Sequence, residues 1–519
     1  MNLVELTQQE LKENDTSKRT DDVNITDVMS EESISEKPER KKECFSLPKV
    51  EQQGINPIPE DERPHKRISD NFTLWFSINT NWIPLSLGML ATEIYHIQFW
   101  QGVTCILIAN IIVTIPGAIF TTFGLRYGLR QIVIARYSYG LLPCYILSAF
   151  NVFAFIGWGI IDVILGAQLL ASVQIQHADV PTNNFPLWAA VLVIVTATLI
   201  ITIFGYSTLH FFERWTWLPL WIIFFIVFGL SVPHLDLSTT SNNDINNGDI
   251  GDVISFFSTM ASAFPIWVQC AADFTVKQPT STNRFLTATL NYFGAIIPNI
   301  LLEIFGLALG TAISGTKNQN LSWRAGYDSY GVGGLAAAIL DPLSGFGKFC
   351  LILLAFGMIV HVAPNNYGCA IQLQALIPGF HKLPIWVFIL VATGVITIAS
   401  VSGAEHLASI LQAVLPLQIY YIIPYVVILL IEHFVVRRGY YPIEIWNSRT
   451  QLPIGIAATV TTLGAYGLGF LGANQSWFKG PAAKYIGEHG GEVGLWITLV
   501  FSVIFYPPIR YLEKRIFGR

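Results

Sequence analysis

Long apolar stretches separated by short polar segments dominate this 519-residue chain. A helix that crosses the hydrocarbon core of a bilayer needs about 20 mostly apolar residues. Stretches of this kind predict an all-α polytopic membrane protein with twelve transmembrane helices. The predicted spans are residues 72–92, 98–123, 143–173, 186–207, 215–233, 253–274, 284–313, 347–373, 384–402, 406–432, 452–472 and 493–511.

Two spans carry helix-breaking residues at corresponding positions. The first contains Asn79-Thr-Asn-Trp-Ile-Pro84, and the sixth contains a proline two residues before Trp267. A broken membrane helix exposes backbone groups, which is tolerated only where they line a cavity or a site. Because the two spans lie five apart, they predict a five-plus-five inverted repeat, residues 71–233 and 252–433, with two added helices in 450–519.

Charge is scarce and concentrated at the N-terminus. Only 13% of the residues are charged, against roughly 25% in soluble domains. Residues 1–70 hold 17 of the 35 acidic and 11 of the 30 basic residues. This segment lacks an apolar core, so it predicts a disordered tail and no signal peptide. Its lysines, such as Lys12, Lys37 and Lys41, are consistent with a solvated tail or with a binding platform for a ubiquitin-ligase adaptor. Nothing in the sequence indicates nucleic-acid binding.

Basic residues in the short loops predict the orientation. With the N-terminus inside, one set of loops carries Arg126, Arg130, Arg214, Lys277 and Arg437, and the opposite set is poorer in positive charge. Both termini are therefore predicted to be cytoplasmic.

An isolated carboxylate, Asp162, lies in the middle of the third apolar stretch, four residues after Trp158. A charge at the bilayer centre costs at least about 2.5 kcal/mol, so such a residue usually has a function. Trp158 and Trp267 come from different spans and could sandwich a planar heterocycle by stacking. The polar side chains expected to read its edge or line the pocket are Asp162, Asn365, Gln269 and Asn79, with Asn81 beside the first break.

Asp162 has two possible roles. It either takes up a proton that is coupled to transport, or stays ionised and pairs with a cationic or donor-rich substrate. Glu303 is a second intramembrane acid, for which a structural hydrogen bond is an equal alternative. His361 could pair with either acid, and it precedes Pro364, which predicts a third interruption in the eighth span.

No catalytic or metal-binding motif is visible. The chain lacks a Gly-x-Ser-x-Gly element, a His-Glu-x-x-His element, a phosphate-binding loop and clustered metal ligands. We therefore expect neither an enzyme nor a cofactor or metal site, and the segment from His489 to Glu492 is interpreted as a turn.

The chain resembles the fungal purine-cytosine permeases of the nucleobase:cation symporter-1 group. The resemblance runs from about residue 55 to the C-terminus. Its motifs are Trp75-Phe-Ser77, Gly128-Leu-Arg-Gln131, Ala135-Arg-Tyr137, Gly157-Trp-Gly159, Ala271-Ala-Asp-Phe-Thr275, Gly345-Phe-Gly-Lys-Phe-Cys350, Pro364-Asn365 and Leu452-Pro-Ile-Gly-Ile-Ala457.

The resemblance implies a leucine-transporter-like fold with alternating access at the plasma membrane. It also implies stacking by Trp158 and Trp267 and edge contacts from residue 162 and Asn365. Three pocket positions depart from the family pattern. Asp162 replaces an amide, Pro84 replaces a serine, and the polar pair before Pro-Asn becomes His361-Val362.

These observations predict a proton-coupled symporter that imports a small planar nitrogen heterocycle, with cytosine or a purine first and sodium as the alternative ion. Asp162, Glu303, His361 and Pro84 are the candidates for coupling or gating. Vitamin B6 is the alternative substrate, and a non-transporting nutrient receptor is the alternative of another class. Membrane lipid and the substrate are the other expected partners.

Overall fold

The computed structural model describes residues 54–174, 185–235, 237, 249–314, 320–404 and 407–519. The N-terminal tail, including the lysines considered above as a ubiquitin-ligase platform, lies outside the described residues. Within them the chain is helical, with one isolated β-bridge between Asn474 and Lys479. The α-helices are α1 (Asp70–Ile78), α2 (Trp82–Glu93), α3 (Phe99–Tyr127), α4 (Gln131–Tyr139), α5 (Pro143–Ala171), α6 (Leu187–Ile203), α7 (Tyr206–Trp215), α8 (Trp217–Ser231), α9 (Ile250–Ala263), α10 (Arg284–Ser314), α11 (Leu321–Leu340), α12 (Ser344–Leu376), α13 (Ile385–Gly403), α14 (Leu407–Ile431), α15 (Ile456–Gly469) and α16 (Gly494–Phe517).

Nine helices of the described residues are long and apolar enough to cross a membrane. Two shorter apolar helices, Leu187–Ile203 and Ile456–Gly472, and the broken pair α1–α2 occupy the other predicted spans. In one of the nine, α11 and α12 are joined as Leu321–Leu376. The twelve-span count therefore stays a prediction.

The predicted break in the first span is present. The chain leaves helical geometry between α1 and α2, and Asn81 caps α2 by accepting a hydrogen bond from the Ile83 N–H at 2.7 Å. Asn79 turns back to α1 and donates to the Trp75 carbonyl at 2.7 Å. Because both asparagine side chains satisfy backbone groups at the break, the interruption is encoded locally.

The sixth span is broken as well, whereas the eighth is not. After α9 the chain continues as two 3-10 segments, Phe264–Gln269 and Ala271–Phe274. In contrast, α12 runs through Pro364 without interruption, so the predicted third break is wrong. Asn365 donates to the Phe155 carbonyl and Asn366 to the Thr393 hydroxyl. These polar side chains bond to neighbouring helices and not to their own backbone, and packing on those helices offsets the hydrogen bond lost at the proline.

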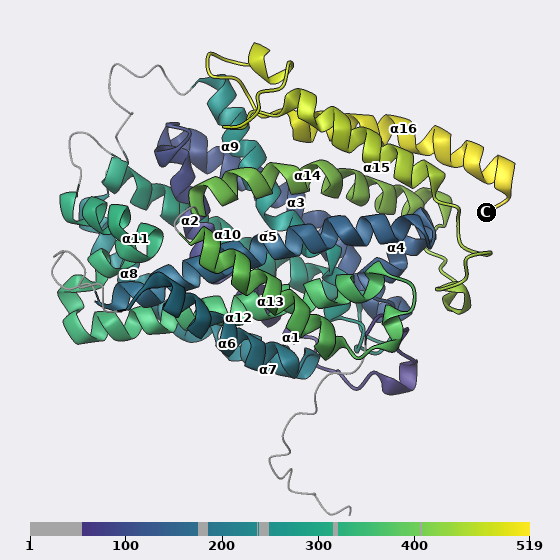
Figure 1. Cartoon of the computed structure of the whole chain (residues 1–519), viewed down its shortest axis with the longest axis horizontal. Coiled ribbons are helices and arrows are strands. Elements are labelled where there is room, and N and C mark those ends of the chain that lie inside the picture. Colours follow the sequence, from purple (N-terminus) through teal and green to yellow (C-terminus); the bar gives the residue numbers. More distant parts are fainter. Residues whose placement is uncertain (1–53, 175–184, 236, 238–248, 315–319, 405–406) are drawn as a thin grey trace, which may run out of the picture. The chain divides into compact units, whose positions relative to one another are not determined.

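Helices at corresponding positions of the two predicted repeats pack against each other. The pairs are α3 with α10, α5 with α12, and α6 with α13. The last two helices, α15 and α16, pack on α14 and lie along one edge of the bundle in Figure 1. This pairing is what two interlocked five-helix repeats followed by two added helices would produce, although the repeat boundaries themselves stay predictions.

Three helices, α4, α7 and α11, fall in segments that were predicted to be loops. In each of them polar, charged or glycine residues interrupt the apolar ones, so a search for long apolar runs passes over it. The helix α11 also bends at Tyr330 and Gly331, whose backbone angles are not helical.

Polar contacts define two opposite ends of the bundle, since α1 and α2 run from one to the other. At the first, which we call the arginine-rich end, Arg63 bonds to the Leu125 carbonyl, Arg130 to the Asp273 carbonyl and Arg214 to the Asp70 carboxylate. The opposite end carries ion pairs between Arg324 and Glu93 and between His489 and Asp252.

Apolar side chains are exposed along the flanks between these ends. On α3, Ile108, Ile111, Ile112 and Ile115 are 46–54% exposed, and α8, α13 and α16 show similar faces. An apolar flank between two polar ends is the surface expected of a helix bundle in a bilayer.

Close backbone contact fixes the second half of the first span against α10. A Cβ atom added at Gly306 would lie 1.9 Å from the Leu85 carbonyl oxygen, and one added at Gly88 would lie 1.9 Å from the Glu303 carbonyl oxygen. Neither carbonyl can move without shifting its helix, so reciprocal glycines permit the close approach of α2 and α10.

We expect Gly306→Ala to separate α2 from α10 and to lower stability by roughly 1–3 kcal/mol, the usual cost of overpacking. The measurement is the thermal midpoint of the purified protein in detergent. Gly394→Ala on α13, where an added Cβ meets nothing within 4 Å, is the matched control. Equal midpoints for the two variants would contradict the close contact.

Candidate functional site

A small buried cavity lies where the breaks of the first and sixth spans face α5, α10 and α12. Its volume is about 30 Å³, room for roughly two water molecules. Thirteen residues line it: Asn79, Asn81, Ile83, Pro84, Leu87, Trp158, Asp162, Ala263, Trp267, Asn299, Glu303, His361 and Asn365. We call this space the central cavity.

The central cavity brings together nine of the ten residues expected to bind substrate, to line the pocket or to couple transport. Gln269 is the exception, because its side chain is buried outside the cavity lining, and its backbone carbonyl accepts a hydrogen bond from Gln372 at 3.3 Å. The expected contact between Gln269 and a substrate, like the roles of the other nine residues, stays a prediction.

His361 connects the break in the first span with the carboxylate of Asp162. Its Nδ1 lies 2.6 Å from the Ile78 carbonyl oxygen, which can only accept, so Nδ1 carries a proton and donates. Its Nε2 lies 3.6 Å from Asp162 Oδ2. The Asn81 amide nitrogen lies 3.1 Å from Nδ1. The histidine therefore turns its second nitrogen toward the acid.

Asp162 is fully buried, and among the described residues neither carboxylate oxygen has a hydrogen-bond partner. The ion pair with His361 is its sole polar contact there, and 3.6 Å is long for a hydrogen bond. A buried carboxylate without close partners is costly as an anion, whereas a proton shared with an imidazole removes most of that cost.

Glu303 is held differently. Asn110 of α3 donates to its Oε2 at 2.6 Å, which gives the acid the structural hydrogen bond considered as one alternative. Asn299 lies one turn earlier on α10 and also lines the central cavity. Sequence reasoning missed Asn299, although its spacing of four from Glu303 places it on the same helix face.

The two indole rings enter from opposite elements, Trp158 from α5 and Trp267 from the 3-10 segment after α9, and both are 4% exposed. The Trp267 ring packs edge-on against the rings of Trp75 and His361, with centroids 5.8 and 5.6 Å apart. Each ring is therefore fixed before any ligand enters.

Gln418 of α14 holds the other indole and was not predicted. It accepts a hydrogen bond from Trp158 Nε1 at 2.9 Å and donates to the Ser262 carbonyl at 3.1 Å. The available signal was a glutamine in a mostly apolar predicted span. Gln418 links the Trp158 ring to the end of α9, next to the break in the sixth span.

A second, larger cavity of about 400 Å³ lies along α2, α9 and α14 toward the end opposite the arginine-rich one. Its lining includes Leu90 and Ser262, whereas the central cavity includes their neighbours Leu87 and Ala263. Only about one helical turn separates the two spaces. We call the larger one the vestibule.

Glu492 in the segment between α15 and α16 closes one side of the vestibule. Its carboxylate accepts hydrogen bonds from the Tyr420 hydroxyl at 2.7 Å, the Asn474 N–H at 2.8 Å and the Gln475 amide at 2.7 Å. Burial raises the pKa of this carboxyl, and the hydrogen bonds oppose the shift. The chain does turn at residues 487–489, as predicted, and Glu492 at the end of that segment is also buried and bonds to α9 and α14.

The arginine-rich end is closed by a network around Asp70, which precedes the first predicted span. Burial alone would raise the pKa of Asp70, but the ion pairs with His65 and Arg214 outweigh it and lower the pKa to about 2. Arg214 belongs to α7, so the start of α1 is tied to that helix.

A buried polar site between two broken membrane helices, with a vestibule on one side, defines a secondary transporter. Comparison with known proteins also indicates a transporter and identifies the family to which it belongs. Residues 57–478 match the family described as permeases for cytosine/purines, uracil, thiamine and allantoin. The chain belongs to this permease family.

Two curated relatives illustrate the range of the family. The purine-cytosine permease fcyB of Emericella nidulans is 32% identical over 91% of this chain and 90% of its own length. The vitamin B6 transporter TPN1 of Saccharomyces cerevisiae is 26% identical over 91% of this chain and 88% of its own length.

A solved structure confirms the fold. Mhp1, a nucleobase-cation-symport-1 family transporter in a closed conformation with bromovinylhydantoin bound, superposes with a TM-score of 0.67. The match covers 89% of this chain and 96% of Mhp1, at 16% sequence identity. The predicted leucine-transporter-like, all-α membrane fold is thereby confirmed.

We expect Gln418→Leu to raise the KM for transport by about 2- to 10-fold, the value of one or two neutral hydrogen bonds. The leucine leaves the indole N–H of Trp158 without an acceptor and frees the ring to turn. Initial uptake rates, normalised to the amount of protein at the cell surface, separate KM from Vmax.

The matched control is Gln372→Leu, which removes another fully buried amide that lies outside the central cavity. It should change the amount of folded protein and leave KM in place. A change in KM of the same size in both variants would show that Gln418 has no special part in orienting Trp158.

Proposed function

We propose that this permease is a proton-coupled importer of a small planar nitrogen heterocycle, with cytosine or a purine as the first candidate, at the plasma membrane. One observation carries the proposal: Trp158, Trp267, Asp162 and Asn365 share a single buried cavity. Indole rings stack on planar heterocycles, and an amide with a carboxyl group supplies donors and acceptors for the ring edge.

Relatives support the choice of substrate. Three purine-cytosine permeases of Saccharomyces cerevisiae are 31–32% identical to the chain, and the vitamin B6 transporter is 26% identical. Vitamin B6 is the second candidate because the carboxyl of Asp162 departs from the amide that the nucleobase permeases are expected to have there. A receptor would bind the heterocycle without moving it across the membrane, so a transport measurement distinguishes the proposed importer from a receptor.

We place the arginine-rich end and both termini in the cytoplasm, since positive charge favours that side of a membrane. The vestibule then faces outward. The central cavity is too small for a heterocycle, so the layer around Gln418 and Ala263 must open to admit one. Substrate would next leave through the arginine-rich end after that side has opened, which is alternating access between two gates.

Coupling is assigned to Asp162 and His361. Since His361 Nδ1 already donates to the broken helix, one further proton can lie on Nε2 or on the carboxyl of Asp162. Proton uptake from the vestibule side neutralises the acid before the site closes. Sodium is the less favoured ion, and we infer transport without chemical conversion of the substrate.

We expect two further partners of the protein, lipid and a ubiquitin-ligase adaptor, to bind outside the central cavity. Lipid is expected on the exposed isoleucines of α3 and the other apolar flanks. A ubiquitin-ligase adaptor is the expected partner of the lysine-containing N-terminal tail, and its test is turnover of a protein that lacks residues 1–50.

Cells without their own nucleobase and vitamin permeases should accumulate labelled cytosine when they express the chain. One pH unit across the membrane is worth about 1.4 kcal/mol per proton and supports about tenfold accumulation. Competition by unlabelled purines, allantoin, pyridoxine and thiamine then ranks the substrates. Saturable binding without accumulation would identify a receptor, and competition by pyridoxine alone would favour vitamin B6.

We expect Asp162→Asn to fold, to bind substrate and to lose accumulation driven by the pH gradient, because an amide cannot carry the proton. Uptake by this variant should stay flat over the pH unit that changes wild-type accumulation about tenfold. Glu303→Gln is the matched control, since Glu303 is also a buried acid of the central cavity. If Glu303→Gln loses the pH response and Asp162→Asn keeps it, the assignment is wrong.

A further inference from the structure

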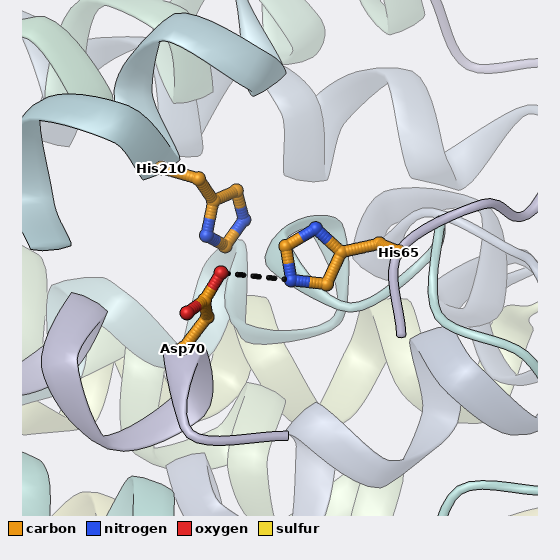
Figure 2. A group of neighbouring side chains, drawn as sticks. All are labelled: His65, Asp70 and His210. Atoms are coloured by element: carbon orange, nitrogen blue, oxygen red, sulfur yellow. Dashed lines mark ion pairs between the residues drawn. The ribbon is translucent and has the colours of Figure 1, made fainter. Parts of the chain in front are cut away.

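Two histidines and an aspartate converge at the arginine-rich end, outside the central cavity. His65 comes from the segment before α1, Asp70 is the first residue of α1, and His210 lies in α7. Figure 2 shows the two imidazole rings and the carboxylate turned toward one another. One ligating atom from each lies within 4.8 Å of the others.

The spacing within this group also fits two ligands of one metal ion. His65 Nε2 and Asp70 Oδ2 are 3.3 Å apart. Bonds of about 2.0–2.2 Å to tetrahedral zinc place neighbouring ligand atoms roughly 3.3–3.6 Å apart. This pair therefore already has the separation of two ligands on one ion, and a small movement of His210 would complete a set of three.

His210 supplies an independent indication. The residue is 4% exposed and interacts with the Phe274 backbone, but among the described residues neither of its ring nitrogens has a hydrogen bond of normal geometry. Buried polar atoms of native proteins almost always have a partner. Its ring packs on the rings of Tyr206 and His65, with centroids 4.4 and 4.8 Å apart, so it is held in place facing the carboxylate.

Neighbouring charge limits the affinity. Arg214 donates to both oxygens of Asp70, and Lys277 Nζ lies 4.9 Å from the centroid of the Tyr206 ring. The arginine fixes the orientation of the carboxylate, but its positive charge opposes a cation on Oδ2. We expect reversible binding and not a permanent structural metal. The side chain of His65 is 15% exposed, which provides access from this end.

The geometry points to a binding site for a divalent transition metal, with Zn²⁺ as the probe, formed by His65, Asp70 and His210 with water completing the coordination. Two imidazoles and one carboxylate are ligands that zinc accepts readily. This replaces the expectation from the sequence that the chain has no metal site. The ligands are separated by up to 145 positions, so no motif could reveal them.

Bound metal would cross-link three elements. An ion held by His65, Asp70 and His210 joins the segment before α1, α1 itself and α7, and α7 packs on α1. Under the proposed function, α1 must move when the arginine-rich end opens. Zn²⁺ should therefore hold that end closed and inhibit uptake, a consequence that depends on the proposed function, whereas binding itself does not.

Binding is tested on the purified full-length protein in detergent, freed of metal with a chelator and titrated with Zn²⁺. The thermal midpoint should rise with the zinc concentration, as for any ligand that binds only the folded state. His65→Ala and His210→Ala should each weaken apparent binding at least about tenfold, since even indirect support of a metal ligand is worth this much. Replacing zinc by Co²⁺ should give the visible absorption of a tetrahedral site in the wild type and not in His65→Ala.

A matched control exists at the opposite end of the bundle, where Asp249, Asp252 and His489 form a more exposed group. His489→Ala should leave zinc binding unchanged. The proposal is overturned if both His65→Ala and His210→Ala bind zinc like the wild type, or if His489→Ala removes the binding. If His210→Ala does not fold, the zinc titration and the cobalt spectrum of His65→Ala decide the question, because His65 is partly exposed.

Inhibition is tested separately in proteoliposomes of defined orientation, with Zn²⁺ added on the side of the arginine-rich end. Uptake by the wild type should fall at least about fivefold, and uptake by His65→Ala should not. Binding without inhibition would keep the site and reject the closing role. Proteoliposomes that take up no heterocycle in the absence of zinc, yet bind zinc when it is added, would contradict the proposed function and leave the metal site intact.

Discussion

The central cavity depends on the backbone carbonyl of Ile78, which lies at the break in the first span and takes its hydrogen bonds from side chains. A broken helix inside a membrane leaves such groups without a partner, and each must be satisfied by protein. Here His361 of α12 donates to that carbonyl, and Asn81 donates to it as well. Because this bond orients the imidazole, it also determines which ring nitrogen faces Asp162.

Two packing features connect the break in the first span and the aromatic rings to the surrounding helices. Reciprocal glycines let α2 lie directly against α10, so the second half of the broken first span cannot drift from the helix that bears Glu303. On the other side, Gln418 connects Trp158 to the end of α9. Gln418 and the end of α9 thus orient the aromatic site and lie next to the layer between the two cavities. Under the proposed function, opening that layer to admit a substrate would therefore be linked to the orientation of the Trp158 ring.

Periodicity and length made the long helices and the breaks of the first and sixth spans predictable, because apolar runs and the residues at their interruptions are local signals. The break predicted at Pro364 was wrong because the effect of this proline depends on neighbouring helices. Those helices accept hydrogen bonds from the side chains of Asn365 and Asn366. Gln418, Gln269 and the cluster around His210 depend on which helices meet in space. One sequence does not contain that information unless a resemblance supplies it, and the roles that the resemblance implied concerned only residues of the pocket.

The carboxyl of Asp162 need not oppose recognition of a nucleobase. A protonated carboxyl offers one donor and one acceptor to a ring edge, which is the pattern that an amide presents. Its ionised form offers acceptors only and has no close hydrogen-bond partner among the described residues. With His361 3.6 Å away, a proton that arrives with the substrate would convert Asp162 into the form that resembles an amide. Substrate recognition and proton coupling would then be one event at one side chain, and a permease with an amide at this position would have to take its coupling ion elsewhere.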